Sequence, residues 1–345
     1  MPSFKSLLTT FALAASIASA HPGHDIAHEA AERREFLSSV KRSSLAHCAS
    51  KLRARGVEAR NIARRSAQVN KARQKRSLKK RDADTVLNTS HNKTSQGFSP
   101  CTAPSVLFAS INSCVLTPEV TQGPYYVAGE YVRENIIEDQ EGLNIVLDYQ
   151  VIDVETCDPV PDVALQLHRR TWLRGIQKTD SDGVAQFESI FPGHYTSRAT
   201  HIHVMVHTNA TLLANQTLGR DNYASHVGQA FFDQDLISQV ETLEPYASNT
   251  QELTLNADDG IMSEETNTDG VDPVMEYTLL GDSISDGLFA WLAFGINSTQ
   301  SSSVSPAAYY YKEGGVANEN SGGGMGGSPP SGAAPGGTPP AKIDE

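Results

Sequence analysis

About 200 residues in the middle of the chain, from Ser99 to Thr299, consist of short runs in which apolar or β-branched residues alternate with polar ones. Turn-forming stretches such as "CDPVPD", "FPGH" and "NADDG" separate these runs. Alternation with a period of two indicates strands, and many short strands with few helical stretches are typical of an all-β sandwich. We therefore expect an all-β fold with one β-sandwich domain over residues 99–299. The runs expected to form strands are "LNIVLDYQVIDV", "VALQLH", "GVAQFESIF", "THIHVMVHT", "QELTLNA" and "MEYTLLGD".

The segments on either side of this domain have different compositions. A basic residue, an apolar run and the small residues "ASA" predict a secretory signal peptide over residues 1–20. Residues 21–81 form a basic leader with apolar residues at helical intervals, and residues 82–98 form a polar linker. The Gly-, Ser- and Pro-rich residues 300–345 predict a disordered tail. We expect a secreted, extracellular protein with no membrane anchor, because no apolar run is long enough to cross a bilayer.

Charge is distributed unevenly between the leader and the rest of the chain. Residues 21–81 hold seventeen Lys and Arg against five Asp and Glu, whereas residues 82–345 hold ten against thirty-five. A secreted chain rarely meets nucleic acid, so we expect no nucleic-acid partner for the basic run. The pairs Lys41-Arg42, Lys75-Arg76 and Lys80-Arg81 favour a propeptide that a processing protease removes, leaving a mature body that begins near Asp82. The alternative is a helical arm that the mature protein retains.

Two further features are typical of the secretory pathway. The chain has five N-glycosylation sequons and four cysteines that an oxidising compartment would allow to form disulfides. Four cysteines permit three complete pairings, and the sequence alone leaves all three open. If the leader is removed together with Cys48, one of the other three cysteines is unpaired. The sequon residues are Asn88, Asn92, Asn209, Asn215 and Asn297, and the cysteines are Cys48, Cys101, Cys114 and Cys157.

The run "THIHVMVHT" contains residues with metal-binding chemistry. Residues two apart on a strand share a face, so His201, His203 and His207 point one way while the intervening Ile and Val residues point the other. His201 and His203 form a chelating pair, and Tyr195, just before the strand, can supply a phenolate. Two imidazoles and an anionic oxygen suit a ferric ion better than zinc or calcium. The alternative is that these histidines bond to backbone or water on a half-exposed strand.

Four motifs occur in a fixed order around this strand: "GPYYVAGEYVREN" (123–135), "WLRGIQKTDSDGVAQF" (172–187), "FPGHYTSRATHIHV" (191–204) and "GQAFFD" (228–233). Together they resemble the intradiol ring-cleavage dioxygenases of the catechol/protocatechuate type, specifically their fungal secreted branch. The resemblance covers roughly residues 114–294. It implies a β-sandwich with iron(III), Fe(3+), held by two tyrosinates, two histidines and a hydroxide. It also implies that O2 opens a catechol-type aromatic diol between its hydroxyl-bearing carbons to give a muconate-type diacid.

The resemblance assigns roles to residues at matching positions. Tyr195 matches the tyrosinate that leaves the iron when substrate arrives, and His201 and His203 match the two imidazole ligands. Arg198 matches the arginine that stabilises charge on the substrate, and Gln229 matches a polar residue of the same pocket.

Two other implications of the family concern the mouth of the cavity and assembly. Pro124 and Tyr125 of "GPYY" are candidates to line the cavity mouth; a rigid turn entering a strand is the alternative. Members of the wider family often form homodimers through an N-terminal helical region, a role open to the leader if it is retained.

One segment of the family pattern is absent. The family's first tyrosinate lies between the strand matching "VALQLH" and the run matching "WLRGIQ", in a stretch resembling W-x-x-N-x-x-G-x-Y. Here only Arg169 and Arg170 separate His168 from Thr171, and no tyrosine stands between Tyr149 and Tyr195. The segment is either missing from this version of the sequence or truly deleted. Two hypotheses follow: an active secreted iron enzyme, or a catalytically impaired secreted β-sandwich that binds aromatics or wall polymer.

Overall fold

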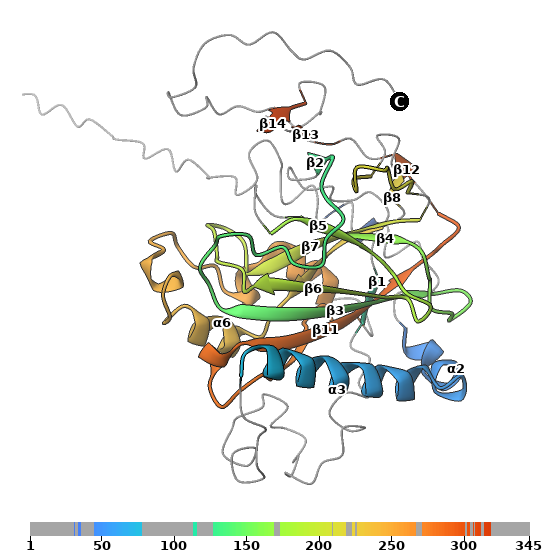
Figure 1. The fold of residues 1–345 in the computed structure, drawn as a ribbon, viewed down its shortest axis with the longest axis horizontal. Coiled ribbons are helices and arrows are strands. Elements are labelled where there is room, and N and C mark those ends of the chain that lie inside the picture. Colours follow the sequence, from blue (N-terminus) through green and yellow to red (C-terminus); the bar gives the residue numbers. More distant parts are fainter. Residues whose placement is uncertain are drawn as a thin grey trace, which may run out of the picture.

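The computed structural model describes residues 31, 34–35, 45–77, 113–115, 127–168, 173–208, 210–218, 223–224, 226–266 and 271–300, and most of 302–318. Their strands form two main sheets (Figure 1). The expected all-β sandwich is therefore confirmed. Among the described residues, no helix has the length and apolar character needed to span a membrane.

The helices and strands follow one another along the chain with these bounds. The helices are α2 Ala49–Ala54, α3 Val57–Lys75, α6 Gln234–Val240 and α7 Gly260–Thr266, with short 3-10 turns at Ala46–Cys48, Tyr246–Ser248, Asn256–Asp258 and Ile284–Asp286. The first seven strands are β1 Ser113–Val115, β2 Val127–Ala128, β3 Asn144–Asp153, β4 Ala164–His168, β5 Gly175–Lys178, β6 Val184–Ile190 and β7 His201–His207. The others are β8 Tyr223–Ala224, β9 His226–Phe231, β10 Glu276–Leu279, β11 Leu288–Ile296, β12 Ser302–Ser303, β13 Ala308–Tyr311 and β14 Gly314–Ala317.

Two sheets face each other across the main core. The first has the strand order β1-β11-β3-β6, with β10 also paired to β11, and the second has the order β5-β4-β7-β9. The longest pairing is parallel and joins β3 to β11 along nine residue pairs, from Ile145 with Leu288 to Asp153 with Ile296. Alternate residues of each strand fill the space between the sheets, as the period of two predicts. They include Leu147 and Phe294 from the first sheet and Val204 and Leu167 from the second.

The described residues 45–77 of the basic leader cover the outer face of the first sheet. Figure 1 shows α3 lying along β3 and β11, with β4, β5 and β7 on the opposite side of these strands. Apolar residues of α3 such as Val69 pack with Phe289 and Trp291 of β11. The helical periodicity expected for the leader is confirmed over α2 and α3. The molecule therefore has three layers: leader helix, first sheet and second sheet.

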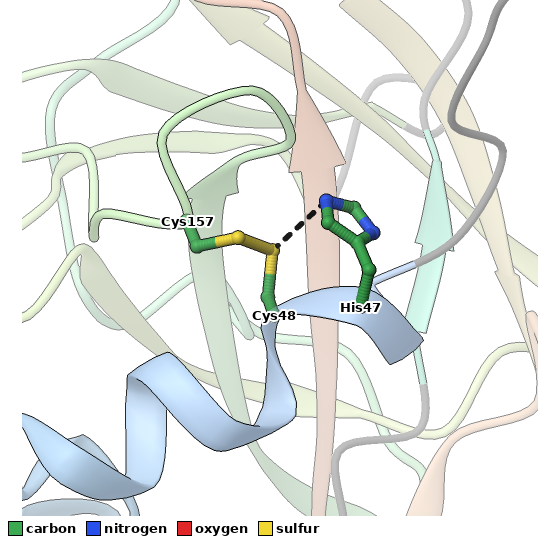
Figure 2. Close-up of side chains that lie close together, drawn as sticks. All are labelled: His47, Cys48 and Cys157. Atoms are coloured by element: carbon green, nitrogen blue, oxygen red, sulfur yellow. Dashed lines mark hydrogen bonds between the residues drawn. A yellow bond between two sulfur atoms is a disulfide. The ribbon is translucent and has the colours of Figure 1, made fainter.

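A disulfide ties the leader to the sandwich. Cys48 pairs with Cys157, which lies 109 residues further along the chain in the turn after β3. Figure 2 shows His47 beside this bond, and its Nε2 lies 3.3 Å from Cys48 Sγ and 2.8 Å from the Val154 carbonyl oxygen. Although His47, Cys48 and Cys157 cluster like metal ligands, sulfurs joined to each other offer no thiolate. Of the three complete pairings, the one that contains this bond also joins Cys101 to Cys114.

The prediction of the strands was wrong at two places. The run "QELTLNA" forms no strand; its residues lie in an exposed loop that ends in a 3-10 turn, where the Asn256 side chain donates to the Phe232 carbonyl oxygen. The strand β11 was missed, because its uninterrupted apolar sequence lacks the alternation of a half-buried strand. Beyond residue 300 the structure describes β12, β13 and β14, and a disordered tail over residues 300–345 stays a prediction. The Tyr-rich "AYYY" of β13 has strong strand propensity, which the average composition of the tail conceals.

Candidate functional site

The strand β7 carries the predicted metal-binding residues on the outer face of the second sheet. Ile202, Val204 and Val206 belong to the main core, so the alternating residues His201, His203 and His207 face away from it. In the sheet register, His203 stands between His168 of β4 and Gln229 of β9. The expected division of this strand into an apolar face and an imidazole face is confirmed.

Tyr195, His201 and His203 come together at one point. The Tyr195 hydroxyl oxygen lies 3.2 Å from His201 Nε2, and His201 Nε2 lies 3.1 Å from His203 Nε2. Both histidines are buried, and Tyr195 is half-buried. Three potential ligand atoms thus lie close together and largely shielded from water. This arrangement suits a bound cation and differs from the half-exposed strand face of the alternative.

The backbone fixes the orientation of one imidazole. His201 Nδ1 lies 2.6 Å from the Ala199 carbonyl oxygen, which can only accept a hydrogen bond, so Nδ1 is the protonated nitrogen. Nε2 then presents a lone pair toward Tyr195 and His203. This is the arrangement typical of a metal-binding histidine, whose second nitrogen donates to a carbonyl or carboxylate.

Arg198 lies in a buried hydrogen-bond network next to these three side chains. Its Nε donates to Asp259 Oδ2 at 2.8 Å, and its terminal nitrogen donates to Gln229 Oε1. All three residues are almost completely buried. Within the described part of the chain, Gln229 Nε2 is a buried donor with no hydrogen-bond partner. The network therefore presents a fixed cation and a free amide donor to the candidate site.

Asp259 was not among the residues predicted from the sequence. Its Oδ2 also accepts from the Ala199 amide, and its Oδ1 accepts from the amides of Ile261 and Met262 in the first turn of α7. The residue lies 61 positions beyond Arg198 in a loop, so local periodicity gives no signal for the contact. The run "NADDG" marks a turn and nothing more.

Several solved structures are similar to this chain. An intradiol ring-cleavage dioxygenase from Tetranychus urticae is 29% identical, with 54% of this chain and 96% of that chain covered and a TM-score of 0.43. The dioxygenase domain of a dioxygenase carbohydrate-binding protein fusion from Streptomyces sp. SirexAA-E is 21% identical, with 52% and 97% covered and a TM-score of 0.33. Catechol 1,2-dioxygenase from Pseudomonas arvilla C-1 is 16% identical, with 51% and 60% covered and a TM-score of 0.31.

The chain is similar to the intradiol ring-cleavage dioxygenases. The sequence motifs indicated the same family, whereas the fungal secreted branch stays a prediction. A scan against protein-family models finds no match for this chain. A search of the curated proteins finds none either.

The first-tyrosine segment that the sequence resemblance implies would start beside the candidate site. The strand β4 ends at His168, whose partner in the register of β7 is His203. The strand β5 then returns antiparallel to β4 from Gly175. An insertion after His168 therefore begins next to one of the two imidazoles. The junction itself, residues 169–172, lies outside the described residues.

The described tyrosines supply one hydroxyl group to the pair of histidines, that of Tyr195. Two buried tyrosines use their hydroxyls elsewhere: Tyr149 donates to the Met275 sulfur, and Tyr246 to the Phe191 carbonyl oxygen. Pro124 and Tyr125, proposed to line the intradiol cavity, lie outside the described residues. His207 shares the face of His201 but contacts Gln166 Oε1 through its Nε2, at 2.8 Å.

Two of the five sequons lie in the described residues. Asn215 is exposed and Asn297 is half-buried. In each, the side-chain oxygen accepts hydrogen bonds from the amide and hydroxyl of the threonine two residues later. This turn holds the asparagine and the sequon threonine together. Asn88, Asn92 and Asn209 lie outside the described residues.

Proposed function

We propose that this protein is a secreted, glycosylated iron(III) dioxygenase that opens catechol-type rings with O2 between the two hydroxyl-bearing carbons. The observation that carries the proposal is the convergence of Tyr195, His201 and His203 beside the buried pair of Arg198 and Gln229. The product is a muconate-type diacid. Full activity, in this proposal, needs the first-tyrosine segment that the chain lacks as written.

The residues present fit a ferric ion. Tyr195, His201 and His203 would hold it, since an anionic oxygen and two imidazoles with fixed orientation suit this metal. When bound, iron(III) supplies Lewis acidity toward the two oxygens of a catechol. The set is one anionic ligand short of the family pattern, because the second tyrosinate belongs to the missing segment.

The surrounding side chains have roles that follow from their contacts. In this proposal the half-buried Tyr195 supplies the oxygen that accepts a catechol hydroxyl proton. Arg198 keeps its positive charge at any working pH and is anchored by Asp259 and Gln229, so it stabilises negative charge developing on the substrate. The unpartnered Gln229 Nε2 donates to a substrate oxygen in this proposal.

A second candidate function is a catalytically impaired β-sandwich that binds aromatics or wall polymer. It is favoured by the single tyrosine hydroxyl at the pair of histidines among the described residues. Without the first-tyrosine segment, His201 and His203 would be the lasting protein ligands, and two neutral imidazoles would stabilise iron(III) poorly.

The two functions are separated by comparing this chain with one in which a family-like segment, W-x-x-N-x-x-G-x-Y, is inserted between His168 and Thr171. Charge transfer from tyrosinate to iron(III) absorbs visible light. We expect the chain as written to show weak colour, substoichiometric iron and near-background ring opening. The chain with the insertion is expected to gain one iron, red-brown colour and muconate formation together. The measurements are iron content and absorbance before and after addition of catechol.

The control is His201→Ala in the chain with the insertion, which should lose iron, colour and activity because one imidazole cannot anchor the ion. If the chain as written binds one iron, is strongly coloured and cleaves catechol, the proposed need for the segment is wrong. If the inserted chain folds but gains neither iron nor activity, the impaired function is the correct one.

A further inference from the structure

The positive charge of the leader is matched by negative charge on the sandwich. Five ion pairs join basic side chains of residues 45–77 to acidic side chains of the body among the described residues. The basic leader and the acidic body therefore carry opposite charges on the two surfaces through which they contact each other. The pairs are Arg55–Asp158, Arg60–Asp182, Arg64–Asp148, Arg65–Asp148 and Lys75–Glu188.

Asp148 is the centre of this contact. It lies on the outer face of β3 and is fully buried, with Arg64 at 3.0 Å and Arg65 at 3.2 Å. The Arg65 side chain is 2% exposed, and its guanidinium lies 5.3 Å from the centre of the Trp291 ring. Leaving a buried charge without its partner is strongly unfavourable. The buried carboxylate of the sheet is thus paired with two arginines of the leader, and Gln186 of the sheet also donates to it at 2.6 Å.

Neutral polar and apolar contacts surround this ion pair. Buried Asn61 of α3 donates to Gln150 Oε1 of β3 at 2.7 Å, and Gln150 Nε2 lies 3.2 Å from Asn61 Oδ1 in return. Leu45, Leu52 and Val57 pack with Ile152 and Ala293 of the sheet. The contact between the leader and the sheet therefore resembles the interior of a domain more than a transient interface.

The disulfide determines what proteolysis can remove. Cys48 lies after the dibasic pair Lys41-Arg42 and before Lys75-Arg76 and Lys80-Arg81. Cutting after the first pair leaves Cys48 in the body. Cutting after either later pair leaves Cys48 on a fragment that is still bonded to Cys157.

We propose that residues 45–77 are a permanent light chain of the mature protein and are not a released propeptide. Cleavage at the dibasic pair Lys80-Arg81 gives a two-chain molecule, joined by Cys48–Cys157 and by the contacts of Asp148. The partner of the acidic outer face of the first sheet is thus this chain's own basic leader. This inference does not depend on ring cleavage, and none of its tests measures it.

The first test is to cut the full-length secreted protein with an endoprotease specific for dibasic sites. Under native, non-reducing conditions we expect the leader fragment and the body to elute together. Mass spectrometry should find a peptide that contains both Cys48 and Cys157, and the fragment should separate on denaturing gels only after reduction. A body that starts at Asp82, with Cys157 bonded to Cys101 or Cys114, overturns the proposal.

The second test removes the covalent bond with Cys48→Ser and Cys157→Ser together. After cleavage, the leader fragment should still elute with the body at low salt. Adding Asp148→Asn should release it, whereas Arg53→Gln should not, because Arg53 pairs with Glu58 within the leader itself. The proposal is overturned if, in the double cysteine variant, the cleaved leader fragment separates from the body and the body alone keeps the melting temperature of the uncut protein. The outer face of the first sheet would then need no cover.

Discussion

Arg198 shows how one side chain at the candidate site is held in place by two buried neighbours, Asp259 and Gln229. Its guanidinium is fully buried between Asp259 and Gln229. Asp259 in turn accepts hydrogen bonds from the first turn of α7, so the position of the cation is coupled to that helix. Such fixed placement lets a charge act on a developing anion without reorganisation.

At the residue scale, we predict that Arg198→Ala in the chain with the inserted segment leaves iron content nearly unchanged, because Arg198 is not a ligand. Turnover of catechol should fall by roughly 10²-fold or more, as is typical when one electrostatic stabiliser is lost. The measurement is iron per chain together with kcat. Asp259→Asn, which keeps the shape and removes the charge, should give a smaller loss in kcat. Unchanged kinetics in Arg198→Ala would mean that the arginine has no part in the reaction.

Individual residues differ in how far the sequence could predict them. The proximity of Tyr195, His201 and His203 follows from the sequence because they lie within nine positions and two share the face of one strand. Asp259 was missed because its contact depends on two loops that meet only in the folded chain. The disulfide was one of three open pairings, since pairing depends on distance in space.

At the scale of elements, the sequence of β3 predicts the strand but not its surroundings. Its alternation puts Asp148 and Gln150 on the face opposite the core, where polar residues normally meet water. Both are buried, because α3 covers that face with polar partners of its own. Period-two patterning identifies the core side of a sheet and cannot distinguish a solvated outer face from one covered by a polar helix.

A related prediction concerns the stability of this layer. Burial alone would raise the pKa of Asp148, but the charges of Arg64 and Arg65 outweigh it and hold the pKa below its usual 3.8. The contribution of ionised Asp148 to the free energy of unfolding is therefore present above about pH 4. It is lost as the pH falls through the lower pKa that Asp148 has in the folded state. Asp148→Asn should cost about 3–5 kcal/mol at neutral pH, because it removes the carboxylate that buried Arg65 contacts.

The measurement for Asp148→Asn is the free energy of unfolding from denaturant titration at neutral pH. The matched control is Arg60→Gln, which removes the half-exposed partner of Asp182. Exposed pairs contribute little, so this change should cost about 1 kcal/mol or less. Equal costs for the two variants would contradict the central place given to Asp148. The Cys48–Cys157 bond adds to the same attachment, by about 4–5 kcal/mol in the chain-entropy account of a loop this long.

At the scale of the whole molecule, a buried histidine contributes to the loss of stability in mild acid. Burial lowers the pKa of His226 to about 3, although the charge of Asp153 opposes this shift. Its Nε2 accepts from the Asn297 amide at 3.1 Å, which requires the neutral ring. The unfolded chain binds a proton at about pH 6.5 and the folded chain does not. Stability therefore declines as the pH falls from about 6.5 toward 3.

We predict that His226→Gln, which keeps an acceptor for the Asn297 amide, makes the protein less sensitive to mild acid. One uncompensated proton changes the free energy of unfolding by about 1.4 kcal/mol per pH unit. The unsubstituted chain should therefore lose roughly 2 kcal/mol more than the variant between about pH 6.5 and pH 5. Denaturant midpoints at the two pH values give this difference. Parallel losses in both chains would mean that the folded protein protonates His226.

The parallel pairing of β3 with β11 affects the order in which the parts of the chain fold. During synthesis, β3 emerges early and finds its antiparallel neighbour β6 soon after, but its other neighbour begins only at Leu288. Contacts between segments so distant in sequence form slowly. The leader is made first, yet Phe289 and Trp291, on which α3 rests, are among the last residues of the sandwich to leave the ribosome. The helix α3, although synthesised before every strand that the structure describes, is therefore among the last elements to dock.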